Sequence, residues 1–183
     1  PELGYRMRAR LHARDRRLGF LLEGTHRLCD AGTTGQLLPE TLAWIAEVER
    51  VMAQERLNGL AGLELAENVK GGERVCHLSL AAGTDTVPFA TLAEGGQLTG
   101  LSAERADRVG VTQLMGSPFV SDVVTTLAGD VPLTVQLRHH VRAFFQGNRF
   151  LLEPLVRHVA GRIPSGPVVD LYAGVGLFGL ALA

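Results

Sequence analysis

Four residues near the end of the sequence could bind a nucleotide-like ligand. An apolar segment, residues 167–170, ends at Asp170 and leads through Tyr172 into a turn that contains Gly174 and Gly176. A strand, a glycine turn and a helix form the first ligand-holding turn of a doubly wound α/β domain. The glycines matter because a residue without a side chain lets the backbone approach a ligand closely. We therefore predict a buried strand that ends at Asp170 and a binding turn after it.

The residue types at this turn favour one class of ligand over others. Gly174, Gly176 and Gly179 match the spacing of a dinucleotide-binding turn, although this pattern alone is weak. The carboxylate of Asp170 disfavours a pyrophosphate, which needs positive surroundings. It suits S-adenosylmethionine (SAM), which carries an ammonium, a sulfonium and an adenosine. The residues favour SAM, with a dinucleotide and a purely structural turn as the alternatives.

A second candidate ligand contact lies upstream, at Gln146. It follows Phe144 and Phe145 at an expected strand-to-helix junction, so its amide could reach a ligand. The alternative is structural, with Asn148 as a helix cap and two phenylalanines in the core.

A basic strand is expected near the beginning of the sequence. Residues 5–14 alternate between apolar and charged types, the pattern of a half-buried strand. Arg6, Arg8 and Arg10 would project from one face about 6.6 Å apart, a spacing that suits contacts to phosphates. The alternative is a solvated edge strand whose charges deter aggregation.

These candidate sites require a mixed α/β fold to position them. A helix over residues 39–57 has proline at its start and helical apolar spacing. Residues 60–69 and 73–81 predict a hairpin around a Lys-Gly-Gly turn. The remaining expected elements are strands at 18–22, 98–101, 109–114, 119–125, 133–137 and 141–145, a helix at 84–94, and a helix from Asn148 to Arg162 or from about Glu153, with Pro154 in its first turn.

Composition excludes several classes of protein. The 183 residues are 46% hydrophobic and 20% charged with a net charge of −1, as in a globular protein. We expect no membrane span, since no apolar run reaches about 18 residues, and a cytoplasmic location, since no signal peptide is recognisable. Cys29 and Cys76 do not have a metal-binding spacing, and His139 and His140 would point to opposite faces of a strand. We predict no metal site.

Taken together, these motifs carry a resemblance to a known family. The pairing of Phe144-Phe145-Gln-x-Asn with Asp170-Leu-Tyr-x-Gly-x-Gly, and the sequence Tyr5-Arg-x-Arg-Ala-Arg, resemble the SAM-dependent RNA (uracil-5-)-methyltransferases. That family makes 5-methyluridine in tRNA and rRNA. The resemblance implies an α+β central domain over residues 1–137 and the start of a Rossmann-like methyltransferase domain over residues 138–183. It also implies SAM as cofactor and RNA, either rRNA or tRNA, as partner. By position it implies five cofactor-binding residues: Gln146, Asp170, Tyr172, Gly174 and Gly176.

The family's reaction needs residues that we do not find here. A cysteine thiolate adds to carbon 6 of uracil, carbon 5 attacks the SAM methyl group, and a base then removes the carbon-5 proton. The nucleophile and base are expected after Ala183, so we assign no catalytic residue, treat the chain as part of a longer protein and expect it to be inactive alone.

Two departures from the family pattern bear on the cofactors. Leu177 stands where the family usually has Asn or Thr, and Thr34 stands near the position of an iron–sulfur cysteine, so no cluster is supported. A non-catalytic RNA-binding module with a degenerate SAM turn and a dinucleotide-dependent oxidoreductase remain alternatives.

Overall fold

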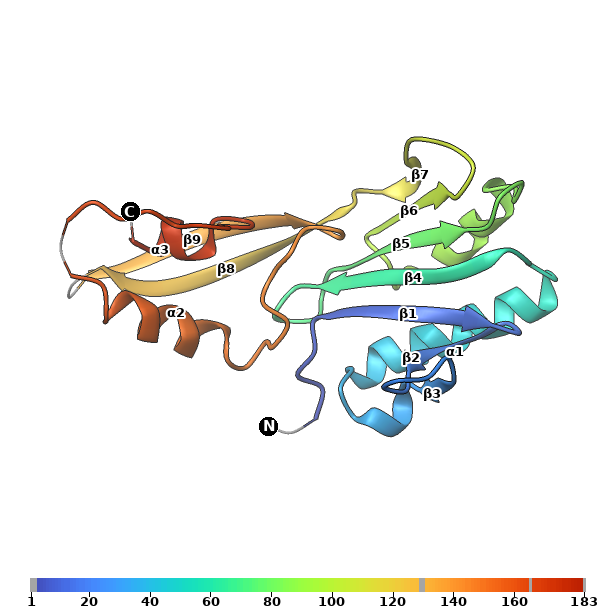
Figure 1. The fold of residues 1–183 in the computed structure, drawn as a ribbon, viewed down its shortest axis with the longest axis horizontal. Coiled ribbons are helices and arrows are strands. Elements are labelled where there is room, and N and C mark those ends of the chain that lie inside the picture. The colour runs from blue at the N-terminus through green and yellow to red at the C-terminus, as the bar shows by residue number, and fades with distance from the viewer. Residues whose placement is uncertain (1–2, 129–130, 165, 183) are drawn as a thin grey trace.

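The computed structural model describes residues 3–128, 131–164 and 166–182. It contains a seven-stranded sheet and, beside it, a separate two-stranded hairpin (Figure 1). The sheet is built from seven strands and backed by one α-helix and two 3-10 helices: β1 (Arg8–Arg14), β2 (Arg17–Leu21), β3 (Leu28–Asp30), η1 (Gly32–Thr34), α1 (Pro39–Gln54), β4 (Leu60–Glu67), β5 (Arg74–Leu80), η2 (Val87–Ala93), β6 (Gly100–Arg105) and β7 (Thr112–Gly116). The hairpin and its two helices follow: β8 (Phe119–Ala128), β9 (Val131–His140), α2 (Leu152–Ala160) and α3 (Leu177–Leu182).

The large sheet has the strand order β3-β2-β1-β4-β5-β6-β7. Its neighbours are antiparallel except for β5 and β6, which are parallel and are joined through η2. The mixed α/β class expected from the sequence is therefore confirmed. So is the hairpin of β4 and β5, which pairs Leu65 with Cys76 and Glu67 with Arg74.

Period-two alternation in β1 places its apolar side chains in the core as predicted. Met7 and Leu11 are fully buried and Ala9 is nearly so. The reversal into β2 uses Asp15 and Arg16, both with positive φ, which gives a tight turn whose twist suits a hairpin. The predicted basic strand thus forms, with regular pairing from Arg8 onward.

The two larger of three apolar clusters among the described residues hold the two parts of the molecule. The larger lies between the seven-stranded sheet and α1, where Trp44, Val48 and Met52 face the strands. The second lies between the hairpin and its helices, and its buried members are Met7, Val124, Leu137, Phe145, Leu152, Val156, Leu177 and Ala181. Met7 of the first part therefore belongs to the core of the second.

Several predicted elements differ from the structure. Residues 141–145 do not form a strand; the chain turns instead, with the Ala143 amide donating to the His140 carbonyl at 2.9 Å. The β8–β9 ladder ends at the pairing of Phe119 with His140, and the Val141 amide makes one more bond, to the Pro118 carbonyl at 2.9 Å, before the chain turns away. The helix after Asn148 begins at Leu152, so Pro154 lies in its first turn, as the shorter alternative predicts.

The predicted buried strand before the glycine turn is wrong for this structure. Residues 167–170 have no strand geometry, and the side chains of Val169 and Leu171 are 80% and 76% exposed. A strand needs a neighbour to satisfy its backbone, and the described residues place none beside this segment. The helix after the turn does form, as α3. The predicted domain boundary after residue 137 falls within β9 and stays a prediction.

Candidate functional site

The structure brings the two predicted ligand-binding segments together around one cavity. The cavity has a volume of about 230 Å³ and lies between the turn after β9 and the segment that leads into α3. Its lining includes three predicted residues, Gln146, Asp170 and Tyr172. The other lining residues are apolar or aromatic: Phe144, Phe145, Leu171, Ala173, Val175, Leu177 and Phe178. Because pockets for whole cofactors occupy roughly 300–1,000 Å³, the described residues surround only part of a ligand of that size.

The backbone of the turn explains why glycine is needed. Gly174 and Gly176 have φ values of +59° and +78°, a region that side chains disfavour. A Cβ atom on Gly174 would also lie 3.3 Å from the Phe144 carbonyl oxygen. Tyr172 has a positive φ of +61° without being glycine, which is unusual and marks a constrained turn. The turn thus packs directly on the Phe144–Gln146 segment.

Asp170 contributes an acceptor with no partner. Its Oδ2 atom is buried and makes no hydrogen bond within the described residues. An unpaired buried carboxylate oxygen is costly, so the site is suited to a donor supplied by a ligand. A cationic or hydroxyl-bearing ligand fits this requirement, and SAM has both kinds of group.

The other predicted residues take different positions at the site. The Gln146 side chain is half-buried and makes no hydrogen bond to any described residue, so its amide is available. The Tyr172 side chain is fully exposed beside the cavity. Leu177, which departs from the family pattern, is 5% exposed and packs in the second apolar cluster. An apolar residue at this position therefore has a structural role in the core.

The segment after Gln146 is anchored to the residues just before β1. Met7 N donates to the Gly147 carbonyl at 2.8 Å, and Arg149 N donates to the Tyr5 carbonyl at 2.9 Å. Asn148 does act as a cap, but of the turn before α2: its side-chain oxygen accepts from the amides of Phe150 and Leu151.

A buried ionic cluster reinforces the same junction. The Glu67 carboxylate, with no exposed surface, accepts from Arg74 Nε and from an Arg149 nitrogen, both at 2.7 Å. Thr41 of α1 also donates to this carboxylate. Arg149 donates in addition to the Val69 carbonyl at 2.9 Å. Sequence reasoning missed this cluster because its members are far apart in the chain and follow no local pattern.

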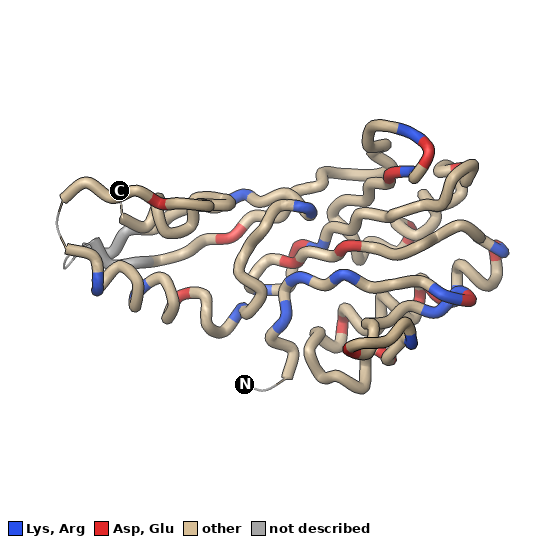
Figure 2. Tube along the Cα trace, viewed as in Figure 1, with Lys and Arg blue, Asp and Glu red and all other residues tan. Residues whose placement is uncertain are grey.

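The predicted RNA-facing arginines divide into two kinds. Figure 2 shows the run of positive charge along β1. Arg8 donates to the Val141 carbonyl at 2.8 Å, and burial lowers the pKa of its guanidinium. Arg6 lies over the Phe20 ring at 5.2 Å and donates to Gln36. Arg10 is exposed, and its guanidinium has no hydrogen-bond partner among the described residues. Of the three, only Arg10 is exposed, whereas Arg6 and Arg8 are half-buried.

Neither cysteine lies at the cavity. Cys76 is fully buried in β5, where burial strongly raises the pKa of its thiol. Cys29 lies on β3, at the edge of the large sheet. His139 pairs with Asp122 while His140 contacts Phe119, which confirms that the two histidines point apart.

Two negative findings concern the described residues alone. No group of three or more His, Cys, Asp or Glu side chains among them is arranged to hold a metal ion. No helix among them is long and apolar enough to cross a bilayer.

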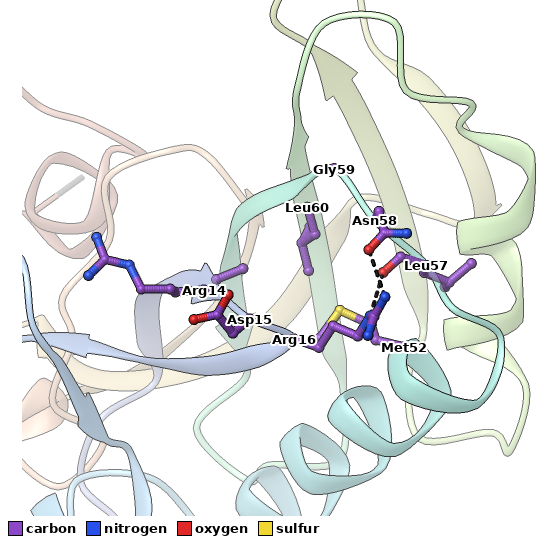
Figure 3. A pocket seen from close by; sticks show the side chains of 9 residues that line it. Arg14, Asp15, Arg16, Met52, Leu57, Asn58, Gly59 and Leu60 are labelled. Atoms are coloured by element: carbon purple, nitrogen blue, oxygen red, sulfur yellow. Dashed lines mark hydrogen bonds between the residues drawn. The ribbon is translucent and has the colours of Figure 1, made fainter.

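A second hollow, of about 340 Å³, lies at the opposite end of the molecule, beside the β1–β2 turn (Figures 1 and 3). There Arg16 donates to the Asn58 side chain at 2.9 Å and reaches the Leu57 carbonyl (Figure 3). None of the residues predicted to bind a cofactor or RNA lines this hollow. We therefore place the candidate site at the smaller cavity.

Comparison with known proteins gives a structural match. No family model matches the sequence, and no curated protein matches it. Over its whole length the chain superposes on the crystal structure of Pyrococcus abyssi tRNA (uracil-54, C5)-methyltransferase in complex with S-adenosyl-L-homocysteine, with a TM-score of 0.73 and 19% identity. The chain spans about half of that structure, 47% of its length. The chain therefore has the fold of this part of a methyltransferase.

Proposed function

We propose that the chain is part of a SAM-dependent RNA methyltransferase that modifies carbon 5 of a uridine in tRNA or rRNA. The observation that carries the proposal is the cavity, where the Phe144–Gln146 segment meets the turn from Asp170 to Phe178. Both segments were expected at a SAM site, and the shared fold with a tRNA methyltransferase supports the same function.

Three groups of this chain would hold the cofactor. The carboxylate of Asp170, which lines the cavity and has an unpaired oxygen, would accept a hydrogen bond from a ligand ammonium or hydroxyl group. The Gln146 amide, which has no partner among the described residues, provides a donor and an acceptor. Gly174 keeps the turn close to Phe144. Bound SAM supplies an electrophilic methyl group, and these residues bind and orient it.

The attack on uracil needs a nucleophilic cysteine and a base, and we place both outside this chain. Cys76 is unsuitable because a buried thiol with a raised pKa forms little thiolate. Cys29 does not line the cavity. We therefore propose that this chain supplies the contacts to cofactor and RNA, with a domain 1–137 that contacts RNA and a domain 138–183 that begins the SAM fold.

For the RNA contact, we propose Arg10 as the main phosphate-binding residue among the three predicted arginines, because Arg6 and Arg8 already have partners within the protein. The Arg10→Ala variant should flatten the dependence of RNA affinity on salt by about one unit of logarithmic slope, as loss of one phosphate contact predicts. Arg50→Ala, which removes an exposed arginine of α1, is the matched control. An unchanged slope in Arg10→Ala would refute the contact.

Calorimetry with S-adenosyl-L-homocysteine tests the cofactor site. We expect the unmodified chain to bind S-adenosyl-L-homocysteine. Gln146→Ala should weaken this binding about 3- to 10-fold through loss of one hydrogen bond. Gly174→Ala should weaken it about 5- to 30-fold through backbone strain. Gln54→Ala on α1 and Gly72→Ala, where a Cβ meets nothing within 4 Å, are matched controls. Absence of binding by the unmodified chain would refute the proposal, and binding of NADH instead would support the oxidoreductase alternative.

A further inference from the structure

A buried aspartate–histidine pair lies directly behind the candidate cofactor cavity. The imidazole of His139 stacks on the Phe145 ring, with centroids 4.1 Å apart and planes inclined by 18°. Its Nε2 atom lies 3.2 Å from Asp122 Oδ2. The other carboxylate oxygen of Asp122 accepts from the Val69 amide at 2.6 Å. One line of contacts therefore runs from the link between β4 and β5, through β8 and β9, to the wall of the cavity.

Phe145 depends on this stack because its backbone is weakly held. The described residues show no hydrogen bond between backbone groups that involves residues 144–146. The nearest such bonds are those of Ala143 on one side and Gly147 on the other. Side-chain packing must therefore fix the segment, and Phe145, 3% exposed, is its only fully buried member.

The carboxylate in turn fixes the orientation of the imidazole. His139 is 1% exposed and Asp122 is 3% exposed, so water does not compete for their contact. A histidine without this partner could rotate about its side-chain torsions, whereas a bound ring presents a fixed face. The face that it presents is the one on which Phe145 lies.

We propose that His139 is a positioning residue for the cofactor site: held by Asp122, its ring sets the position of Phe145 and, through it, of the neighbouring Gln146 amide. The proposal rests on the proposed function of the cavity. His139 does not line the cavity itself, so it acts through Phe145 and is no catalytic residue.

Two substitutions separate ring stacking from simple stability. His139→Phe keeps an aromatic ring against Phe145 and loses the contact to Asp122, while His139→Leu loses both. Leu65→Ala, in the core of the large sheet, is a control that lowers stability without touching this region. Binding of S-adenosyl-L-homocysteine is measured by calorimetry at a temperature where all variants are folded, and amide hydrogen exchange is followed over residues 141–149 in the ligand-free chain.

We expect His139→Leu to bind about threefold to tenfold more weakly, the effect of one lost aromatic pair, and to exchange faster at the hydrogen-bonded amides of Val141, Ala143 and Arg149. His139→Phe should lose less affinity than His139→Leu, because it keeps the stack on Phe145 and loses only the contact to Asp122, and its melting temperature falls. Leu65→Ala should lower the melting temperature alone. Equal binding by His139→Leu and the parent, or an equal loss in both His139 variants, would overturn the proposal.

The outcomes also distinguish this inference from the proposed function. If the parent chain binds no S-adenosyl-L-homocysteine, the proposed function fails, and the exchange measurement still decides whether His139 orders the segment. If His139→Leu does not fold, Phe145→Leu removes the same stack from the other side, and unchanged exchange in that variant would overturn the proposal.

Discussion

Replacing Glu67 by glutamine should destabilise the chain far more than its single-atom change suggests. Glu67 has no exposed surface, and the Arg74 and Arg149 side chains are 6% and 4% exposed. The carboxylate is the only acidic group that forms an ion pair with either arginine in the described residues. Glutamine would leave two buried guanidinium groups without a counter-charge and would turn an amide donor toward one of them.

The magnitude follows from the cost of breaking a buried ion pair by removing one partner, about 3–5 kcal/mol. The full exclusion from solvent supports this range, since screening by water is absent. For a chain of this size, one kcal/mol lowers the melting temperature by about 2–4 °C, so the expected fall is of order 6–20 °C. Arg149→Met should cost less, because the Glu67–Arg74 pair stays intact.

Urea unfolding followed by circular dichroism measures the free energy of unfolding directly. Glu47→Gln is the matched control: Glu47 pairs with Arg50 on the exposed face of α1, and its loss should leave the unfolding midpoint unchanged. A change of less than about 1 kcal/mol in Glu67→Gln would show that the cluster adds little to stability and would refute the reasoning.

Two further predictions concern His77 and the cysteines. Burial lowers the pKa of His77, so the unfolded state binds a proton at this residue more readily than the folded state. The free energy of unfolding should therefore fall as the pH drops below about 6.5, and His77→Gln should reduce this fall in urea titrations between pH 7 and 5. An equal fall in both proteins would contradict the prediction. Cys29 is half-exposed, whereas Cys76 is buried and its thiol pKa is raised. A thiol reagent should therefore label one cysteine in the native chain and two in urea. Rapid labelling of both cysteines in the native chain would contradict the buried placement of Cys76.

Local patterns predicted the central part of the fold well. The alternation over residues 5–14, the proline start of α1 and the Lys-Gly-Gly turn between β4 and β5 each act within a few residues, so each could be read directly. The cavity could also be anticipated, because Gln146 and the glycine turn belong to recognisable motifs. The structure then brought these two motifs together.

What the sequence could not supply depends on distant partners. Residues 167–170 are apolar enough for a strand, but a strand forms only beside a neighbour. Residues 141–145 have strand composition, yet the ladder ends at His140. Asp122 did carry a usable signal: it is the single charged residue in the sequence of β8, and a charge on a half-buried strand indicates a buried partner, but not which one.

The arrangement around Gly147 links the candidate RNA surface to the candidate cofactor site. β1 carries Arg8 and Arg10, and residues 5–7 just before it pair with residues 147–149, immediately after Gln146. The same junction is closed by the Glu67–Arg149 contact and by the amide of Glu67, which donates to the Met7 carbonyl at 2.8 Å. Moving Gln146 away from β1 would break these bonds and expose a buried carboxylate, a cost of several kcal/mol. The end of this cavity wall next to Gly147 is therefore tied to the large sheet, while Phe145 rests on the His139 stack; the Asp170 side of the cavity has no comparable bonds to that sheet among the described residues. A change in the cavity on ligand binding should thus be larger on the Asp170 side than at Gln146, which directly precedes the anchored Gly147.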